Sequence, residues 1–526
     1  MDRILRLFAL LALAAACLPV QVAAAKSFPV TNLANEGEGS LRQAILAANS
    51  FMGLDTIPIQ VTGTVNLETA LPTITDDVEI LGPGASAFTV RRAVAPDFRI
   101  FTIGPTVDVS ISGLTAKHGR SAFAGGILSQ HDSALALGTL SLVRVVVTEN
   151  EAAASSGSQA VATGGGVLAE GALVVRESTI SANQVNADAG TDQTVARYGG
   201  IGAFRSLQII ASTISGNTVE AVSPGSQVVA SEGGIGAFGV TTIERSTISA
   251  NSVTAADGTS QTVAQAGGLS SFSNLTLSNS TVTANSVTST QSAMAANLNV
   301  FGTNLIRSTI VSAPQGGANC VGGTTTSGGF NIEDGANCGF SQPTDRSGTD
   351  PGIGLLQNNG GPTLTHALLP GSAAIDSGNA FGATADQRGL PRPRDLAGIA
   401  NGLGSDGSDV GAYELQALAA DPVPTPTTLP GQLSVNDDRK APNTRIISGP
   451  PRSTYKRLAK FRFASNEGLS TFQCKVDKAP WQRCKSPRRY RVAPGKHLFK
   501  VRAKDRNGNV DPTPAQFGWR VKKIVG

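Results

Sequence analysis

The chain has 526 residues, of which 40% are hydrophobic, 15% are charged and 5% are aromatic, and 60 residues are glycine. This length excludes a single small domain, and the apolar fraction excludes a disordered chain, which would lack the residues for a core. The small net charge of +4 is the sum of an acidic N-terminal part and a strongly basic C-terminal part. We expect an all-β stack with small residues at tight turns.

The first 25 residues have the features of a secretory signal. Arg3 and Arg6 precede an apolar run at residues 7–20, and three alanines then provide a small-residue cleavage site. We therefore predict that residues 1–25 are removed and that the mature protein is extracellular or at the cell surface. The alternatives are an uncleaved anchor, although the run is short for a membrane span, and lipidation of Cys17. We expect no transmembrane helix in the mature chain.

The middle of the chain repeats every 34 residues. Each copy carries a Ser-Thr-Ile-Ser or similar motif, followed by an asparagine. The motif starts at Ser178, Ser212, Ser246 and Ser280, and the asparagines are Asn183, Asn217, Asn251 and Asn285. A period of this length indicates a stacked array. A helical tetratricopeptide array is excluded, because the copies are rich in Ser, Thr, Val, Ile and Gly and their apolar residues alternate.

The repeats predict a solenoid of short strands, a right-handed parallel β-helix with coils about 4.8 Å apart. We place its N-terminal cap at residues 26–60 and its coils at residues 61–345. Equivalent residues then form ladders, because each coil lies on the previous one. Two aliphatic ladders are expected inside: Val175, Ile209, Ile243 and Leu277, and Ile180, Ile214, Ile248 and Val282.

A polar segment follows the asparagine in three copies, at residues 186–197, 220–231 and 254–265. These segments are rich in Gly, Ala, Asp, Ser and Gln, so we predict loops that project from one side of the stack as a wall. The wall is either a tolerated insertion or a binding surface, and we favour the insertion slightly.

A short helix is predicted near the start of the mature chain. Ser40 would cap it, and Gln43 would complete a capping box. Four apolar residues would share one face and cover the open end of the solenoid: Leu41, Ala44, Ile45 and Ala48. Val-Thr-Asn-Leu at residues 30–33, followed by Gly-Ser-Leu-Arg-Gln-Ala-Ile at residues 39–45, resembles the opening motif of exported "CSLREA" β-helix proteins, with Gly39 in place of the usual cysteine.

A second group of motifs follows the repeats. It includes Asn-Asn-Gly-Gly-Pro-Thr at residues 358–363, Ala-Ile-Asp-Ser-Gly at 374–378, Asp-Gln-Arg-Gly at 386–389 and Asp-Val-Gly-Ala-Tyr-Glu at 409–414. This string is similar to the choice-of-anchor Q region of surface β-helix proteins. The resemblance implies a pectin-lyase-like solenoid, and we assign residues 346–415 to its C-terminal cap.

The same stretch gathers six polar residues: His366, Asp376, Asp386, Arg388, Asp409 and Glu414. They would form either an ion-paired cap that closes the C-terminal end or a site for catalysis or calcium. We favour the cap, because clustered polar groups often serve structure.

A Pro- and Thr-rich linker is predicted at residues 416–440, and residues 441–526 form a separate unit. Apolar residues alternate in this unit, as at Phe461 and Phe463, which is typical of strands. Phe-Gln-Cys at residues 472–474, together with several neighbouring motifs, resembles the immunoglobulin-like modules of bacterial surface proteins. The resemblance implies a β-sandwich.

Four cysteines follow the signal segment: Cys320, Cys338, Cys474 and Cys484. Their even number and the export signal favour disulfides, and proximity in the sequence suggests the pairs Cys320–Cys338 and Cys474–Cys484. Free buried thiols are the alternative. Since no Cys-x-x-Cys motif or histidine cluster occurs, we expect no metal site and no cofactor.

Charge is the sharpest functional signal. Residues 441–526 contain 21 Lys and Arg against 4 Asp and Glu, a balance of +17, which leaves 21 against 34 and a balance of −13 for residues 1–440. The candidate polyanion-binding residues are Lys456, Arg457, Lys460, Arg483, Lys485, Arg488, Arg489, Arg491, Lys500, Arg502 and Lys504. The alternatives are attraction to an anionic polysaccharide or cell-envelope polymer and a merely solvated surface. Because the chain carries an export signal, we expect no nucleic-acid partner.

Two functions fit these observations. The first is a non-catalytic surface protein for adhesion or interaction with a polysaccharide or envelope polymer. The second is a polysaccharide lyase or glycoside hydrolase of the parallel β-helix type, which rests on fold analogy alone. Such an enzyme needs converging carboxylates, but Glu177 is replaced by Ala211 and Arg245 at equivalent positions. We therefore assign no catalytic residues and favour the first function.

Overall fold

The computed structural model describes residues 25–93, 95–132, 138–155, 159–188, 192–223, 227–323, 325–416, 441–465, 471–484, 486–504 and 509–523. The predicted signal segment and linker therefore lie almost entirely outside the described residues. Internal contacts divide the chain into two compact units, with the boundary between residues 421 and 422.

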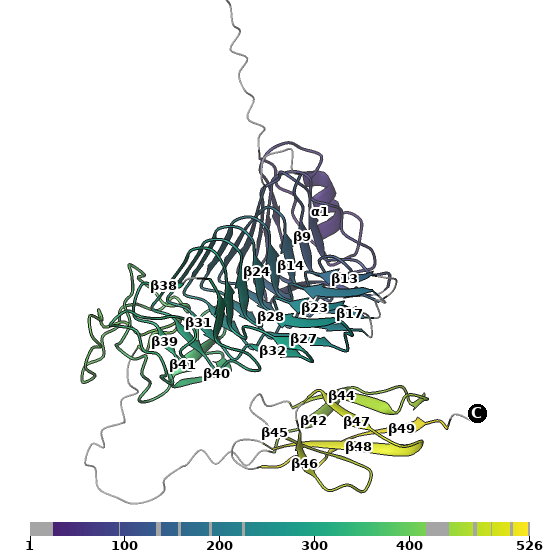
Figure 1. Cartoon of the computed structure of the whole chain (residues 1–526). Helices are drawn as coiled ribbons and strands as arrows, with labels where there is room; N and C mark the ends of the chain where they lie inside the picture. The colour runs from purple at the N-terminus through teal and green to yellow at the C-terminus, as the bar shows by residue number, and fades with distance from the viewer. Residues whose placement is uncertain are drawn as a thin grey trace, which may run out of the picture. The chain divides into compact units, whose positions relative to one another are not determined.

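The first unit is a parallel β-helix, which confirms the predicted fold (Figure 1). Three long sheets of parallel strands run along it, and each coil contributes one strand to each sheet in most of the stack. The first sheet contains β1 (Asp55–Pro58), β3 (Val78–Leu81), β6 (Val109–Ser112), β10 (Thr139–Val143), β15 (Ala172–Arg176), β20 (Leu207–Ile210), β25 (Thr241–Glu244), β30 (Leu275–Ser278), β35 (Asn304–Arg307) and β38 (Thr325–Ser327). The second contains β2 (Gly63–Leu67), β4 (Phe88–Arg92), β7 (Thr115–Lys117), β11 (Val146–Thr148), β16 (Thr179–Ser181), β21 (Thr213–Ser215), β26 (Thr247–Ser249), β31 (Thr281–Thr283), β36 (Ile310–Ser312) and β39 (Ile332–Glu333). The third contains β5 (Phe101–Ile103), β9 (Ile127–Ser129), β14 (Val167–Ala169), β19 (Ile201–Ala203), β24 (Ile235–Ala237), β29 (Leu269–Ser271), β34 (Leu298–Val300) and β37 (Cys320–Gly322).

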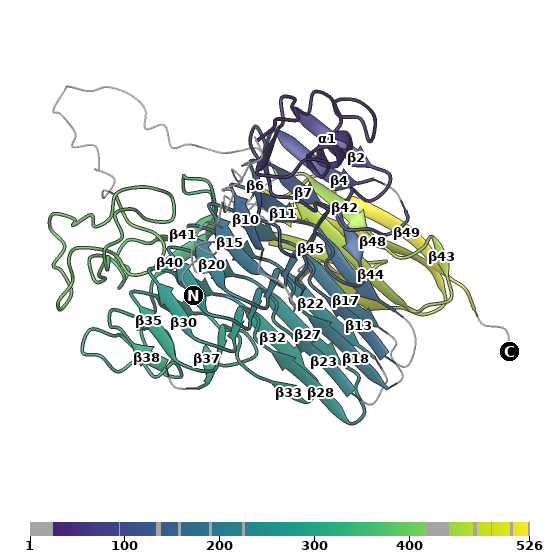
Figure 2. The same cartoon turned by 90° about the horizontal axis from the view of Figure 1, so that it is seen from above.

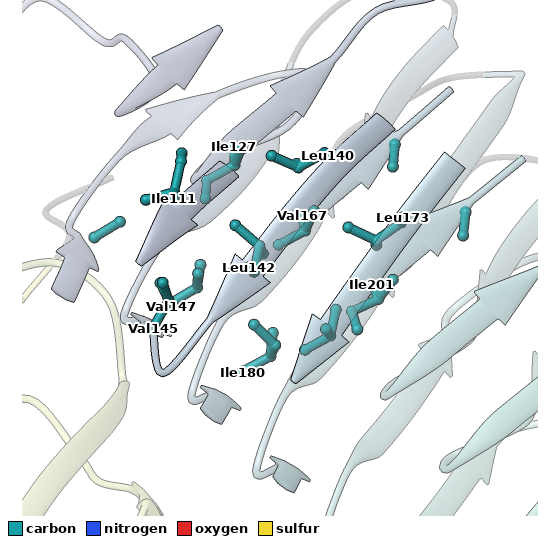
Figure 3. Close-up of a cluster of buried hydrophobic side chains, with 14 of the residues drawn as sticks. Ile111, Ile127, Leu140, Leu142, Val145, Val147, Val167, Leu173, Ile180 and Ile201 are labelled. Atoms are coloured by element: carbon teal, nitrogen blue, oxygen red, sulfur yellow. The ribbon is translucent and has the colours of Figure 1, made fainter. Parts of the chain in front are cut away.

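The predicted aliphatic ladders form the core of the coils. Val175, Ile209 and Ile243 are direct partners in adjacent parallel strands and are fully buried. The ladder through Ile180 and Ile214 is buried in the same way. Figure 3 shows such side chains filling the space between the sheets. Burial of a large aliphatic side chain contributes about 1.5–3 kcal/mol, so the repeated ladder stabilises every coil.

The asparagines of the repeat form a hydrogen-bonded ladder. The Nδ2 atom of Asn183 donates to Oδ1 of Asn217 at 2.9 Å, and Asn217 donates in the same way to Asn251. The backbone N–H of each residue donates to the same oxygen at 3.1 Å. These buried amides satisfy one another, as polar groups in a dry interior must.

The prediction of loops after each asparagine is wrong. Each segment forms two strands, and these stack into two parallel sheets that project from one side of the coils (Figure 2). We call this pair of projecting sheets the flap. The first flap sheet contains β8 (Arg120–Ser121), β12 (Glu151–Ala154), β17 (Gln184–Asp188), β22 (Thr218–Val222), β27 (Ser252–Ala256) and β32 (Ser286–Ser289). The second flap sheet contains β13 (Gln159–Thr163), β18 (Gln193–Arg197), β23 (Gln227–Ser231), β28 (Gln261–Gln265) and β33 (Ser292–Ala293).

The flap has a small core of its own. Val185 and Ala187 from the first flap sheet pack with Ala196 from the second, and all three are buried. Alanine and valine alternate with polar residues, so each strand presents a narrow apolar face to the other sheet. Composition alone suggested loops because the apolar residues are small.

The N-terminal helix is present as predicted, but Gln43 does not complete the capping box, because the Ser40 N–H donates to the Gly37 carbonyl at 3.2 Å. The helix is α1 (Leu41–Ala48), and Ser40 Oγ accepts a hydrogen bond from the Gln43 N–H at 3.2 Å. The four residues of the predicted apolar face are buried: Leu41, Ala44, Ile45 and Ala48. They join the core of the coils, which shields the first strands from solvent.

The residues after the coils fold back along the second sheet. They include one antiparallel pair, β40 (Ile353–Gln357) and β41 (Thr365–Leu368). Gln387 hydrogen-bonds to Thr213 and Thr247 in adjacent coils, and the neighbouring Thr281 is also buried. The predicted C-terminal cap is therefore also a lateral cover on the outer face of the second sheet.

The second unit consists of two sheets that pack face to face, as expected for an immunoglobulin-like sandwich. The three-stranded sheet contains β42 (Thr444–Ser448), β44 (Leu458–Ser465) and β47 (Arg488–Arg491). The other sheet contains β43 (Ser453–Thr454), β45 (Thr471–Val476), β46 (Gln482–Cys484), β48 (Gly495–Lys504) and β49 (Ala515–Val521). The rings of Phe461 and Phe499, one from each sheet, stack at 4.0 Å between centroids in a shared core.

Both suggested disulfides are formed. Cys320 and Cys338 are joined in the first unit, with their Cα atoms 4.9 Å apart. Cys474 and Cys484 are joined in the second unit, with a Cα separation of 5.8 Å. Disulfides of this kind are typical of proteins that fold in an oxidising compartment.

Candidate polyanion-binding surface

The three-stranded sheet of the second unit carries cations on its outer face. Phe461 and Phe463 point into the core, so Lys460 and Arg462, which alternate with them on β44, point outward. The strand register places residues of β42 and β47 on the same side. We call this surface the β44 face, and it consists of Arg445, Lys460, Arg462, Arg489 and Arg491.

The five-stranded sheet carries a larger set of cations on its own outer face. Phe499 and Val501 are buried, so Lys500 and Arg502 point outward, as the sequence alternation predicted for Lys500, Arg502 and Lys504. The register adds cations from β45, β46 and β49. We call this surface the β48 face, and it consists of Lys475, Arg483, Lys496, Lys500, Arg502, Lys504 and Arg520.

The candidate cations of the sequence are therefore divided between two faces. Three lie on the β44 face: Lys460, Arg489 and Arg491. Four lie on the β48 face: Arg483, Lys500, Arg502 and Lys504. Lys456 and Arg457 are exposed in the connection before β44, and Arg488 starts β47, with its guanidinium 5.4 Å from the Tyr490 ring. Lys485 lies outside the described residues.

Like charges face each other directly across strands of this module. On the β48 face, Lys475 is the cross-strand partner of Lys500, and Lys496 is the partner of Arg520. On the β44 face, Lys460 is the partner of Arg489. Side chains in such positions are neighbours, and like charges there destabilise a sheet. An anionic ligand along the β48 face would remove this repulsion.

A tryptophan lies among these cations. The Arg502 guanidinium is 4.4 Å from the Trp481 ring and the Lys475 ammonium is 5.3 Å from it. Cation–π contacts of this kind hold cationic side chains in place at a surface. Sequence reasoning missed Trp481, although it is one of only two tryptophans in the chain.

The described carboxylates of the module bind groups other than these lysines and arginines. Asp477 Oδ2 lies 2.8 Å from His497 Nδ1; burial acts to lower the pKa of His497, but the interaction with Asp477 and the hydrogen bond with the Ala493 carbonyl outweigh burial and raise it. Asp511 is buried; burial acts to raise its pKa, but hydrogen bonds from Thr444 and Thr513 outweigh burial and lower it. Glu467 and Asp505, the other acidic residues of the module, lie outside the described residues.

The polar groups of the C-terminal cap form a buried network. Arg388 pairs with Asp386 at 2.7 Å, and Arg392 pairs with Glu414 at 2.6 Å. The Arg388 guanidinium also lies 3.7 Å from the centre of the Tyr413 ring. Arg388 and Arg392 therefore each have a buried carboxylate partner, as in the ion-paired cap that we favoured, whereas Asp376 and Asp409 accept hydrogen bonds from backbone N–H groups.

Burial perturbs the acids and the histidine of this cap. Burial, together with the neighbouring Glu414, raises the pKa of Asp409 to about 7, against hydrogen bonds from Leu415 and Asp376 that lower it. Burial also raises the pKa of Asp376 and lowers the pKa of His366. His366 Nε2 lies 2.9 Å from Ser249 Oγ and Nδ1 lies 2.7 Å from the Gly354 carbonyl, so the ring joins the cap to the coils.

The coils carry one row of partly exposed aromatic rings. Phe204, Phe238, Phe272 and Phe301 stack in sequence at 5.0, 4.6 and 5.2 Å between centroids. Each inner ring has its two faces covered by its neighbours, so mainly ring edges meet solvent. This stack stabilises successive coils, and its inner rings, Phe238 and Phe272, offer no open face on which a sugar could lie.

The described residues hold no group of three or more His, Cys, Asp or Glu side chains arranged to bind a metal ion. Within the same part of the chain, no helix combines the length and apolarity needed to span a membrane. Comparisons with protein-family models, curated proteins and solved structures found no match for this chain.

Proposed function

We propose that this is an exported or cell-surface, non-catalytic β-helix protein whose basic module binds an anionic polysaccharide or another anionic polymer of the cell envelope. The signal-like N-terminus and the resemblance to CSLREA and choice-of-anchor Q proteins support the location. The resemblance to immunoglobulin-like modules supports a binding role for residues 441–526.

One observation carries the proposal. The β48 face holds seven cations and two like-charged pairs that lie directly opposite each other across its strands, Lys475 with Lys500 and Lys496 with Arg520, whereas the β44 face holds five cations and one such pair. A rigid sheet that keeps such pairs together bears a standing electrostatic cost, which a bound polyanion would offset. Phosphate, sulfate or carboxylate groups spaced along a polymer would suit such a row of cations.

The test compares two full-chain variants of equal charge. The first replaces Lys475, Lys496, Lys500 and Lys504 on the β48 face with glutamine. The second replaces Arg445, Lys460, Arg462 and Arg491 on the β44 face in the same way. Both lose four positive charges, so a difference between them reports the position of the charges and not the net charge.

We expect the β48-face variant to elute from an immobilised anionic polysaccharide at much lower salt than the wild type, and the β44-face variant to elute close to the wild type. Equal losses in both variants would mean attraction by net charge alone. Unchanged retention in both would show that neither face binds the polymer. Either result contradicts the proposal.

A further inference from the structure

A cavity lies on the first unit, where the C-terminal cap meets the corner between the first and second sheets. Its volume is about 250 Å³, close to the lower end of the range for small-molecule sites. Six of its lining residues matter here: Glu244, Arg245, Ser278, Asn279, Arg307 and Phe381. All of these residues belong to the first unit.

Two of the residues that line this cavity each have a buried polar atom without a hydrogen-bond partner among the described residues. These atoms are Asn279 Oδ1 and Arg307 Nε. Asn279 is only 3% exposed, and its Nδ2 donates to the Ala380 carbonyl at 2.9 Å, which fixes the amide with its oxygen free to accept. Buried polar groups without partners are rare in proteins and cost about 1–3 kcal/mol each, so a bound group that satisfies both is favoured.

The remaining polar groups define what such a ligand carries. Arg307 is held by its contact with the Phe381 ring, with the guanidinium carbon 4.6 Å from the ring centre. With Arg245 it gives the cavity two guanidinium groups against the single carboxylate of Glu244. Two cations and one anion leave a net positive charge that suits one ligand carboxylate. Asn279 Oδ1 and Glu244 are acceptors, so they suit ligand hydroxyl groups.

We propose that this cavity binds a hydroxylated carboxylate of about monosaccharide size. The carboxylate would contact Arg245 and Arg307, and hydroxyl groups would donate to Asn279 and Glu244. Arg245 also lines a second cavity of about 210 Å³ beside the first. A free sugar acid would fill only the first cavity, whereas the terminal acidic residue of a polysaccharide would extend into the second.

The test uses variants on one ladder of the solenoid. Positions 144, 177, 211, 245 and 279 are equivalent in successive coils, and position 211 is alanine. Arg245→Ala therefore introduces the residue that the preceding coil has at the equivalent position, so the variant is expected to fold. Arg144→Ala is the matched control, because it removes the same charge from the same ladder position outside the cavity.

Binding of D-glucuronate to the full chain is measured by isothermal titration, with D-glucose as the neutral probe of the same ring size. We expect one glucuronate per chain, weaker binding by about tenfold in Arg245→Ala, and no change in Arg144→Ala. Asn279→Asp, which places a second carboxylate beside the ligand, should weaken glucuronate binding at least as much.

Equal binding of glucose and glucuronate, or equal losses in the Arg245 and Arg144 variants, would overturn the proposal. Absence of binding to the wild type would also overturn it, because the two buried atoms would then be satisfied by water. A glucuronate-terminated trisaccharide distinguishes the sources of the ligand. Tighter binding than the monosaccharide indicates a polysaccharide end, and weaker binding indicates a free acid. Because the β48 face takes no part, these results are independent of polymer retention by the basic module.

Discussion

Replacement of Glu232 by glutamine is predicted to remove a pH-dependent loss of stability from the β-helix. Glu232 follows β23 in the turn to the third sheet and is 3% exposed, and its Oε2 has no hydrogen-bond partner among the described residues. Burial raises the pKa of this carboxyl from 4.5 to about 7, although Ser231, Arg197 and Ser270 act to lower it. The folded state therefore holds the proton more tightly than the unfolded state.

The sign and size of the effect follow from this difference. The stabilising contribution is complete below pH 4.5 and is lost as the pH rises through about 7. With 1.36 kcal/mol for each unit of pKa, the loss between pH 5 and pH 8 is about 2.5 kcal/mol. Glutamine has nearly the same shape and does not titrate, so the E232Q variant lacks this loss.

Urea unfolding of the first unit at pH 5 and pH 8, followed by circular dichroism, measures the effect. The free energy of unfolding should fall between these pH values by about 2–3 kcal/mol more in the wild type than in E232Q. The control is E177Q, which removes an exposed carboxylate from another turn and should behave as the wild type. If E232Q and the wild type show the same pH dependence, Glu232 does not titrate near neutrality and the reasoning fails.

Three further predictions concern the first unit. Asn217→Ala interrupts the asparagine ladder and should lower the free energy of unfolding by about 2–4 kcal/mol. Asn186→Ala on the flap is the control and should lower it by less than about 1 kcal/mol. Equal losses in the two variants would contradict a stabilising role of the asparagine ladder. Arg392→Met leaves Glu414 buried without its partner and should lower the free energy of unfolding, measured in urea, by about 3–5 kcal/mol. The exposed Arg394→Met is the control and should lower it by less than about 1 kcal/mol. A small effect of both variants would show that the buried pair does not hold the cap. Purified residues 26–415 should release no unsaturated or reducing ends from pectin or alginate; release that is lost on changing one carboxylate would establish the lyase or hydrolase alternative.

Much of the β-helix could be predicted because equivalent positions recur every 34 residues, so the same kind of residue is found at each of them several times. A single Ile180 is uninformative, but Ile214 and Ile248 at the same step predict a ladder whose members must be buried together. The disulfide pairs also followed from proximity in the sequence. These features depend on local or strictly periodic relations, which a single sequence displays.

The flap and the lateral cover could not be predicted in this way. Ala187 and Ala196 are too small to signal a buried face by hydrophobicity, yet two stacked sheets bury them against each other. The contacts of Gln387 with Thr213 and Thr247 join residues 174 and 140 positions apart, and no repeat links them. The cavity between the C-terminal cap and the coils depends on the same long-range packing, so the sequence did not mark Asn279 and Arg307 as residues of a binding site.

The division of the basic module into two faces was only partly predictable. Alternation placed Lys500, Arg502 and Lys504 on one side of a strand, as the structure shows. The direct pairing of Lys475 with Lys500 depends on the register between β45 and β48, which alternation does not determine. Register therefore supplied the observation on which the proposed function depends.

The most direct test of that function compares residues 441–526 with residues 26–416 for retention on an immobilised anionic polymer of the cell envelope. The basic module should be retained at low salt and released steeply as salt rises, because the Debye length shortens to about 8 Å at physiological ionic strength. The β-helix belongs to the part of the chain with a net negative charge, so it should not be retained on the immobilised polymer. If the isolated module is retained no better than the β-helix at low salt, its cations form only a solvated surface and the central claim is wrong.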